Sequence, residues 1–308
     1  MLDYLSLAAL AAVVREGSFE KAAAALCVTP SAISQRVKGL EERVGAILLT
    51  RGTPCRPTAI GAKLCAHMEQ VRLLESEVVH DLPGLAGQET GPHTVRVAVN
   101  ADSVSTWFPA VATQFAAETG ALLDLVLEDE AHTAERLRAG EVLAAVTADP
   151  TPVVGCRIYP LGVIEYVAVA SPDFLGRFFD AGVDAAGLRR APVLRFDRRD
   201  ELQSRWARAA WGTEVSSAIH WTPSTQGMLD MTLAGLGWSM APLPLALPLL
   251  DSGRLIELPP YRRIAVTLYW QRTRLTARLL DRLTDAVRSV AARRLAPVQA
   301  PEQLPGHD

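Results

Sequence analysis

Between Ser18 and Leu40 the sequence places small, apolar and polar residues at the spacing of two short helices joined by a tight turn. Small side chains stand where such helices would cross, at Ala22, Ala23 and Ala32. Apolar side chains that would pack the two helices together stand at Phe19, Leu26, Val28, Ile33, Val37 and Leu40. The second helix keeps an outer face formed by Pro30, Ser31, Ser34, Gln35, Arg36 and Lys38. Polar and basic side chains of these types hydrogen-bond base edges and phosphates, and a helix N-terminus favours a phosphate. The stretch therefore predicts a helix-turn-helix that reads double-stranded DNA, and the alternative is a plain helical hairpin with a polar exposed face.

The elements around this motif predict a small helical DNA-binding domain over residues 1–58. Apolar residues at helical spacing over 2–16 predict a preceding helix. Thr29-Pro30, a capping residue followed by proline, begins the last helix of the motif, and Gly45 ends it. Residues 46–57 hold short apolar pieces around a Gly-Thr-Pro turn, which favours a hairpin or wing.

A long helix is expected from the capping residue Thr58 to about Leu82, inside a linker that spans 59–90 and ends in a hinge rich in glycine and proline. Its apolar residues step by three or four: Leu64, Met68, Val71, Leu74, Val78 and Leu82. So narrow a stripe is typical of a helix that pairs with a second copy. The alternative is an ordinary amphipathic helix packed on its own domain.

Strands alternate with helices after the hinge, which predicts an α/β domain with a largely parallel sheet over 91–297. Strands are expected at Thr94–Val99, Leu122–Leu127, Val142–Thr147, Ile164–Ala170, Val193–Phe196, Ala218–Trp221, Gly237–Ala241 and Ala265–Trp270. Helices are expected at Trp107–Glu118, Ala134–Ala139, 201–210, 226–234 and Thr276–Arg293. The last strand and helix return to the first lobe, so lobe I takes 91–161 and 266–297, lobe II takes 162–265, and 298–308 form a tail.

Polar side chains follow the carboxyl ends of several expected strands, where α/β sheets bind ligands. The first lobe offers Asn100, Asp102, Ser103, Thr106 and Trp107, whose hydroxyls at a helix start suit a carboxylate, and the acids Glu128, Asp129 and Glu130. The second lobe adds Glu165, Asp197 and Thr225. Anion-binding groups on one side and acids on the other match an α-amino acid with a cationic side chain.

Each of these effector-site residues also has a local interpretation. Ser103 and Thr106 suit N-capping, and the acids at 128–130 suit solvated charge at a helix start. Asp197 precedes Arg198-Arg199 and suits local pairing, and Trp107 suits the core.

Composition separates a basic N-terminal part from an acidic remainder. The 308 residues are 49% hydrophobic and 21% charged, which excludes a disordered chain. The net charge of −3 divides into +3 over residues 1–66 and −6 over the rest, so the N-terminal part suits an anionic partner.

Several functional classes are not expected. The four cysteines lack a C-x-x-C spacing, the N-terminus lacks a signal peptide pattern, and the uncharged run Ala234–Leu250 is broken by three prolines. A reduced cytoplasmic protein without a membrane span is therefore expected, rather than a secreted solute-binding protein. Scattered histidines and the absence of catalytic or nucleotide-binding motifs predict no enzyme, no metal and no cofactor.

The residues from Ala22 to Arg51 match the pattern AAxxLxVTPSAISQRVKxLEExVGxxLLTR, which resembles the N-terminal signature of LysR-type transcriptional regulators. The resemblance spans the chain and implies a winged helix-turn-helix, a linker helix and a two-lobed effector domain like the periplasmic binding proteins. It implies dimers that pair into tetramers, promoter DNA and RNA polymerase as partners, and a small-molecule effector. It carries over Thr29, Ser31, Ser34, Gln35 and Arg36 for DNA contact, and Arg51 and Thr58 for the DNA backbone.

Further segments resemble the branch of that family called ArgP or LysG, also known as chromosome-initiation inhibitors. They are VNADSVSTWF (99–108), EDEAHTAERLRAGEVLAAVT (128–147), LYWQR (268–272), LCVTPSAISQR and CRPT (55–58). This branch implies a transcription activator that senses lysine or arginine and controls an amino acid exporter gene. Two alternatives stay open: an origin-binding inhibitor of replication initiation, and a LysR-type regulator with a different effector.

Overall fold

The computed structural model describes residues 3–50, 52–81, 93–128 and 133–298. Four sets of residues discussed above therefore lie outside the described residues: Arg51, the hinge at 82–92, the pair Asp129 and Glu130, and the tail from 299.

The N-terminal part is a three-helix unit with a small hairpin, as its capping residues predict. Its helices are α1 (Tyr4–Glu16), α2 (Phe19–Ala25) and α3 (Pro30–Val44), and its strands β1 (Leu49–Thr50) and β2 (Arg56–Pro57) pair antiparallel. The side chains of Asp3, Ser18 and Thr29 each accept a hydrogen bond from a backbone N–H of the first turn, so each helix begins at a satisfied end. Fully buried side chains of α1 and α3 form its core, among them Leu7, Leu10, Ile33 and Leu40.

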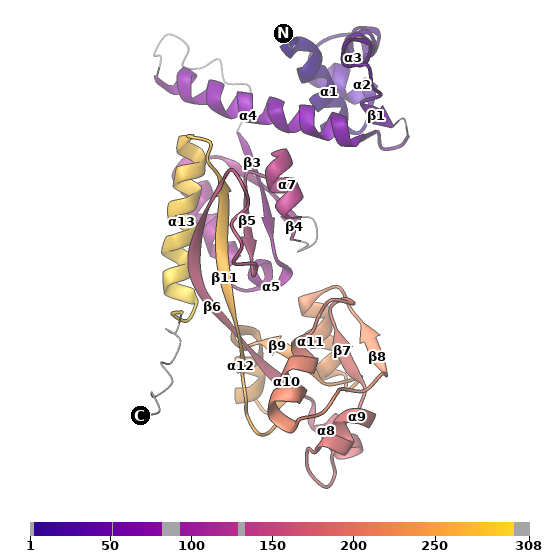
Figure 1. Cartoon of the computed structure of the whole chain (residues 1–308), viewed down its shortest axis with the longest axis vertical. Coiled ribbons are helices and arrows are strands. Elements are labelled where there is room, and N and C mark those ends of the chain that lie inside the picture. The colour runs from indigo at the N-terminus through magenta and orange to yellow at the C-terminus, as the bar shows by residue number, and fades with distance from the viewer. Residues whose placement is uncertain (1–2, 51, 82–92, 129–132, 299–308) are drawn as a thin grey trace, which may run out of the picture.

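Helix α4 (Ala59–Asp81) joins this unit to the rest of the chain (Figure 1). The Thr58 hydroxyl accepts from the Gly61 N–H at 3.2 Å and donates to the Ile47 carbonyl at 2.9 Å, which ties the helix start to the wing. Met68 is buried in the N-terminal core and Leu73 in the core of the C-terminal domain. Leu74 and Val78, farther along the expected stripe, are 41% and 57% exposed. One stripe thus packs on its own chain at one end and remains uncovered at the other.

Two helical glycines should respond oppositely to alanine. A Cβ on Gly61 would lie 2.1 Å from the Leu48 carbonyl oxygen, whereas a Cβ on Gly39, in α3, meets nothing within 4 Å. Gly61→Ala is expected to destabilise the protein by about 1–3 kcal/mol, since backbone must shift. Gly39→Ala is expected to stabilise it by up to about 1 kcal/mol, since helical glycine costs conformational entropy. Urea unfolding of both variants checks this, and equal shifts would contradict the close approach of α4 to the wing.

One seven-stranded mixed sheet organises the C-terminal domain, in the order β10-β6-β11-β5-β3-β4 with β9 also paired to β6. Only β3 (Thr94–Val99), β4 (Leu122–Leu127) and β5 (Ala144–Thr147) run parallel to one another. The remaining strands pair antiparallel: β6 (Cys156–Ala170), β9 (Ser239–Pro242), β10 (Ile256–Glu257) and β11 (Ile264–Thr273).

The expectation of a largely parallel sheet is therefore wrong beyond the first three strands. A parallel neighbour requires a crossover, usually through a helix, but residues 148–155 between β5 and β6 contain none. Strand β11 returns from lobe II and enters between β5 and β6 in the antiparallel sense. Strand β6 also begins at Cys156 rather than Ile164, because Pro160 and Gly162 weaken the strand pattern of its first half.

Strands β6 and β11 connect the two lobes (Figure 1). They pair along ten registered positions, from Ile264↔Tyr166 to Thr273↔Cys156, with a register shift between Leu268 and Tyr269. The expected lobe boundaries at 161/162 and 265/266 thus fall inside strands that run through both lobes.

Helices complete both lobes. Lobe I carries α5 (Ala101–Ser105), α6 (Phe108–Thr119), α7 (Thr133–Ala139) and α13 (Arg278–Arg294). Lobe II carries the parallel pair β7 (Val193–Arg195) and β8 (Ile219–Trp221), with α8 (Pro172–Phe178), α9 (Ala185–Arg190), α10 (Leu202–Trp211), α11 (Thr225–Leu233) and α12 (Leu243–Asp251). Helices α8, α9 and α12 were not expected, since they are short or interrupted by proline.

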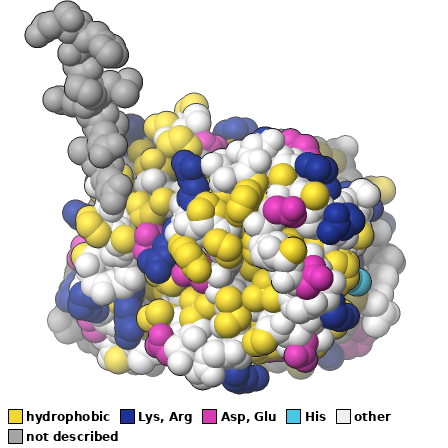
Figure 2. Space-filling model, turned by 90° about the horizontal axis from the view of Figure 1, so that it is seen from below, with side chains coloured by type: hydrophobic (Ala, Val, Ile, Leu, Met, Phe, Trp, Pro, Cys, Tyr) yellow, Lys and Arg dark blue, Asp and Glu magenta, His cyan; other side chains and the backbone are white. Residues whose placement is uncertain are grey.

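The outer face of the molecule seen from below mixes charged and apolar side chains, with apolar ones gathered near its middle (Figure 2). Large apolar side chains of lobe II that are at least a third exposed include Trp221, Met231, Leu236, Leu247, Ile256 and Tyr261. None of the helices within the described ranges has the length and apolar composition that a membrane span requires.

Candidate functional site

The first half of α3 presents the polar face that the helix-turn-helix motif predicted. Ile33 and Val37 point into the core, while Ser31, Gln35 and Lys38 are exposed and Ser34 and Arg36 are half-buried. Lys38 lies 3.8 Å from Glu42 in an exposed i,i+4 ion pair. The structure therefore brings these side chains to one surface of one helix.

The two predicted threonines also hold the backbone of this surface. The Thr29 hydroxyl accepts from the Ala32 N–H at 3.2 Å, with Pro30 as the first helical residue. Thr58 caps α4 as described above. Because these oxygens already serve as caps, each threonine can meet DNA only through its remaining lone pair or its backbone.

A cavity of about 640 Å³ lies between the lobes, at the carboxyl ends of β3 and β4. Five residues named as candidates for the effector site line it: Asn100, Asp102, Glu128, Asp197 and Thr225. Asn100 caps α5 by accepting from the Ser103 N–H, so its side chain has a structural role at the cavity wall. A volume of this size is typical of small-molecule sites.

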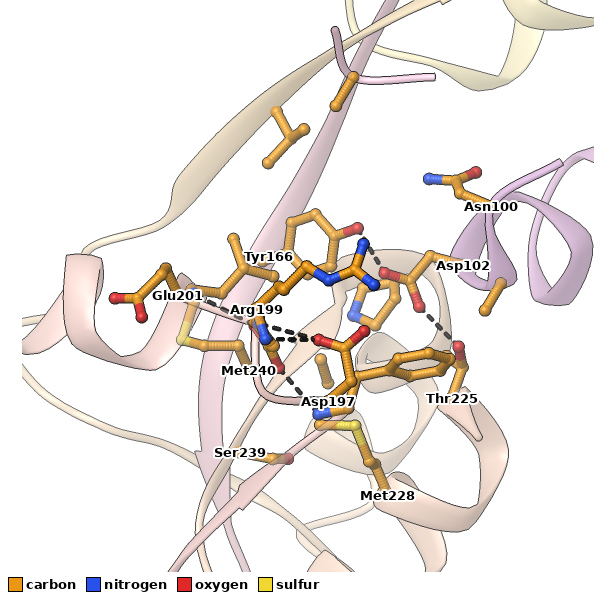
Figure 3. Close-up of a pocket in the computed structure, with 18 of the residues that line it drawn as sticks. Asn100, Asp102, Tyr166, Asp197, Arg199, Glu201, Thr225, Met228, Ser239 and Met240 are labelled. Atoms are coloured by element: carbon orange, nitrogen blue, oxygen red, sulfur yellow. Dashed lines mark hydrogen bonds between the residues drawn. The ribbon is translucent and has the colours of Figure 1, made fainter. Parts of the chain in front are cut away.

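Asp102 stands at the centre of a hydrogen-bond network that joins the lobes (Figure 3). Its carboxylate accepts from the Tyr166 hydroxyl at 2.5 Å and from the Thr225 hydroxyl at 2.6 Å. Asp102 belongs to lobe I and Thr225 to lobe II, whereas Tyr166 lies on the connecting strand β6. One carboxylate thus links three elements far apart in the sequence.

The charge state of this network depends on its burial. Burial raises the pKa of Asp102, the hydrogen bonds from Thr225 and Tyr166 lower it, and the charge of Asp200 raises it further. Burial and the same two carboxylates hold the pKa of Tyr166 well above its usual range, so the phenol keeps its proton and donates. Two carboxyl groups from opposite lobes therefore interact across the cavity.

The acids of lobe II are partly engaged in shaping the loop after β7. Asp197 accepts from the backbone N–H groups of Arg199 and Asp200 at 2.8 and 3.0 Å, which supports the local interpretation of this residue. Asp200 accepts from the Phe196 and Leu202 N–H groups and from the Gln203 amide. Glu201 lies 3.6 Å from the Arg208 guanidinium.

Four predicted effector residues do not line the cavity. Ser103 and Trp107 are buried and paired, since the indole N–H donates to the Ser103 hydroxyl at 2.9 Å. The Thr106 hydroxyl donates to the Asp102 carbonyl at 2.6 Å. Glu165 faces the opposite side of β6 from Tyr166 and lies 3.9 Å from Arg263. Asp129 and Glu130 lie outside the described residues.

Several lining residues were not predicted, and they come from helices, strands and loops of both lobes. They include Arg136, Tyr166, Arg199, Asp200, Glu201, Arg205, Met228, Ser239 and Met240. Tyr166 had a usable signal, because it is a hydroxyl-bearing residue inside a mostly apolar strand. Glu128, noted with the acids after β4, also lines the cavity.

Comparisons with known proteins agree with this architecture. Residues 5–62 match the lysR family of bacterial regulatory helix-turn-helix proteins, and residues 88–292 match the LysR substrate binding domain. The regulator ArgP of Pseudomonas fluorescens Pf-5 is 44% identical over 301 residues, which cover 98% of this chain and all of that protein.

Two solved structures of full-length relatives are also similar. ArgP from Mycobacterium tuberculosis has a TM-score of 0.77 at 41% identity, covering 96% of this chain and all of that one. LysG from Corynebacterium glutamicum, solved with bound arginine effector, has a TM-score of 0.68 at 39% identity over the same shares. This chain belongs to the LysR family of DNA-binding bacterial transcription regulators, which are not enzymes.

Proposed function

We propose that this chain is a transcription regulator whose effector is a basic amino acid, L-arginine or L-lysine, bound between the lobes. The observation that carries the proposal is that Asp102 of lobe I and Asp200 of lobe II both line the cavity between the lobes. A cationic group placed near both carboxyls offsets part of their negative charge, so an ammonium or guanidinium is the natural occupant. The arginine bound to the related LysG supports the same ligand class.

The charged residues that line the cavity also suit the carboxylate of a basic amino acid. Its lining holds five acidic side chains and the arginines Arg136, Arg199 and Arg205. An excess of acids matches a ligand with two cationic groups and one carboxylate, and a guanidinium binds that carboxylate bidentately. Leucine lacks the second cation and would leave the excess negative charge of the lining unbalanced.

Calorimetry of the full chain with L-arginine, L-lysine and L-leucine tests the effector. Binding of the two basic amino acids, with leucine far weaker, is expected. Equal binding of leucine would reject the charge argument and leave the family assignment intact.

The proposal extends to DNA, assembly and target. In the cytoplasm, helix α3 enters the major groove of promoter DNA. Helix α4 pairs two chains through Leu74 and Val78, and two such dimers form a tetramer. The exposure of these two side chains in the single chain supports their burial in a dimer interface.

We assign contact with RNA polymerase and activation of an exporter gene for basic amino acids to the same regulator. Footprinting of the regions upstream of its target genes tests promoter binding, and light scattering tests the oligomeric state. A reporter gene on the exporter promoter, measured with and without arginine, tests activation. Protection of a replication origin instead of a promoter would favour the replication role.

Arg36→Ala is expected to weaken binding to the footprinted promoter fragment by about 1–3 kcal/mol, the usual loss for a base-reading side chain. Arg36 forms no ion pair with any described residue, so its removal leaves no unpaired acid. Fluorescence anisotropy at fixed salt measures the effect, with Arg254→Ala in lobe II as the control for lost charge. An affinity equal to that of the control would place Arg36 away from the bases.

A further inference from the structure

A second cavity of about 280 Å³ lies where the linker helix meets lobe I. Its walls are Lys63, His67 and Gln70 of α4, residues 137–140 at the end of α7, residues 154–156 and Thr273 of β11. Figure 1 shows α4 lying across the end of lobe I that carries α7. It shares no described lining residue with the cavity between the lobes, so it is a separate site.

The charged side chains among the described lining residues of this second cavity are all cationic. Lys63 and Arg138 face it from opposite walls, and neither forms an ion pair within the described part of the chain. Burial raises the pKa of the Cys156 thiol, another lining residue, and the charges of Arg274 and Arg138 lower it. Positive charge without a matching acid makes the cavity attractive to an anion.

Two buried polar atoms on the walls also lack hydrogen-bond partners among the described residues. They are Nε2 of His67 and Oγ1 of Thr273. The His67 ring also lies near the Tyr4 ring, with the ring centroids 6.2 Å apart. Buried polar atoms are nearly always hydrogen-bonded, and both of these can act as donors to an oxygen atom.

The backbone of lobe I is shaped to let α4 approach this closely. Gly140 adopts a left-handed conformation with φ of +72°, and a Cβ there would lie 2.3 Å from the Gln70 amide nitrogen. The linker helix therefore lies against lobe I at this point, with the Ala66 Cβ 3.7 Å from the same position.

We propose that this junction binds a small oxyanion, a phosphate or a carboxylate group, between α4 and lobe I. Lys63 and Arg138 supply the charge, the Thr273 hydroxyl donates a hydrogen bond, and His67 donates from Nε2 in that tautomer or as the cation. An anion held from both sides fixes the linker helix on the effector domain. A second metabolite would thereby act on the joint to the DNA-binding part, independently of the amino acid effector.

Calorimetry and thermal unfolding of the full-length protein test the site, with inorganic phosphate and citrate compared against sodium chloride at equal ionic strength. Phosphate or citrate is expected to bind and raise Tm. The one that binds more tightly shows whether the site prefers a phosphate or a carboxylate group. The double variant Lys63→Gln/Arg138→Gln removes two exposed side chains and is expected to bind at least about tenfold more weakly. Arg254→Gln, which removes an exposed charge in lobe II, should bind like the unmodified chain.

Two results would overturn the proposal. In one, neither anion differs from chloride. In the other, both bind but the double variant matches Arg254→Gln, which places the anion elsewhere on the protein. Thr273→Val keeps the shape of the side chain and removes its hydroxyl donor. This variant is an independent test and should also bind the anion more weakly.

Discussion

Asp102→Asn is expected to weaken binding of L-arginine about tenfold to a hundredfold, because it removes a buried negative charge while preserving the shape of the side chain. The amide oxygen can still accept from either Tyr166 or Thr225, which donate to the two carboxylate oxygens at 2.5 and 2.6 Å. The network between the lobes therefore loses charge without losing all its contacts. Calorimetry of the variant measures the change in affinity.

The control for Asp102→Asn is Asp251→Asn, an exposed carboxyl at the end of α12 that does not line the cavity. Its arginine affinity should equal that of the unmodified chain. If the Asp102→Asn protein binds arginine as tightly as this control, the cationic group of arginine must bind to the acids of lobe II instead of Asp102.

The same carboxyl predicts a pH dependence of arginine binding. Burial and the charge of Asp200 raise the pKa of Asp102, and only its ionised form attracts a cation. Arginine affinity is therefore expected to fall as the pH is lowered through the raised pKa of Asp102, and the Asp102→Asn protein should lose that part of the dependence. Calorimetry across a pH series checks the sign, and a stronger affinity at low pH would contradict it.

Leu40→Ala is expected to lower the free energy of unfolding of the N-terminal unit by about 2–5 kcal/mol, the usual cost of a cavity at a buried leucine. Leu40 is 1% exposed and packs in the N-terminal core with Leu7, Leu10 and Ile33. That core is separate from the core of the effector domain. Promoter binding should therefore fail at a lower temperature, while arginine binding persists.

The matched control is Leu5→Ala, since Leu5 is 64% exposed and loses little contact when truncated. Urea unfolding followed by circular dichroism, with anisotropy for DNA and calorimetry for arginine, separates the two domains. Parallel loss of both activities in Leu40→Ala would mean that the two units unfold together.

The fold of the N-terminal DNA-binding domain was predictable because its signals are local. Ser18, Thr29 and Thr58 cap helices through bonds to residues three positions away. Such contacts need no knowledge of the rest of the fold. The pairing of α4 with lobe I through Leu73 joins distant segments, and the spacing of apolar residues alone did not predict it.

The effector cavity was predictable only in part, because strand geometry decides which side chain faces it. Asp102 and Thr225 follow strand ends and line the cavity as expected. Glu165 and Tyr166 are neighbours on β6, and successive residues of a strand face opposite sides. The sequence suggested the acid, whereas the sheet turns the phenol toward the cavity. The antiparallel entry of β11 decides this orientation through its register with β6.

The pairing of Ile264 with Tyr166 means that the chain leaves for lobe II and comes back at adjacent positions. Lobe II is therefore an insertion with neighbouring ends, the topology that tolerates exchange of whole segments. Lobe II of a relative with another effector can therefore be joined at these two positions as one continuous segment. Such an exchange would replace the lobe II wall of the cavity, while this regulator kept its own Asp102 in lobe I and its own operator.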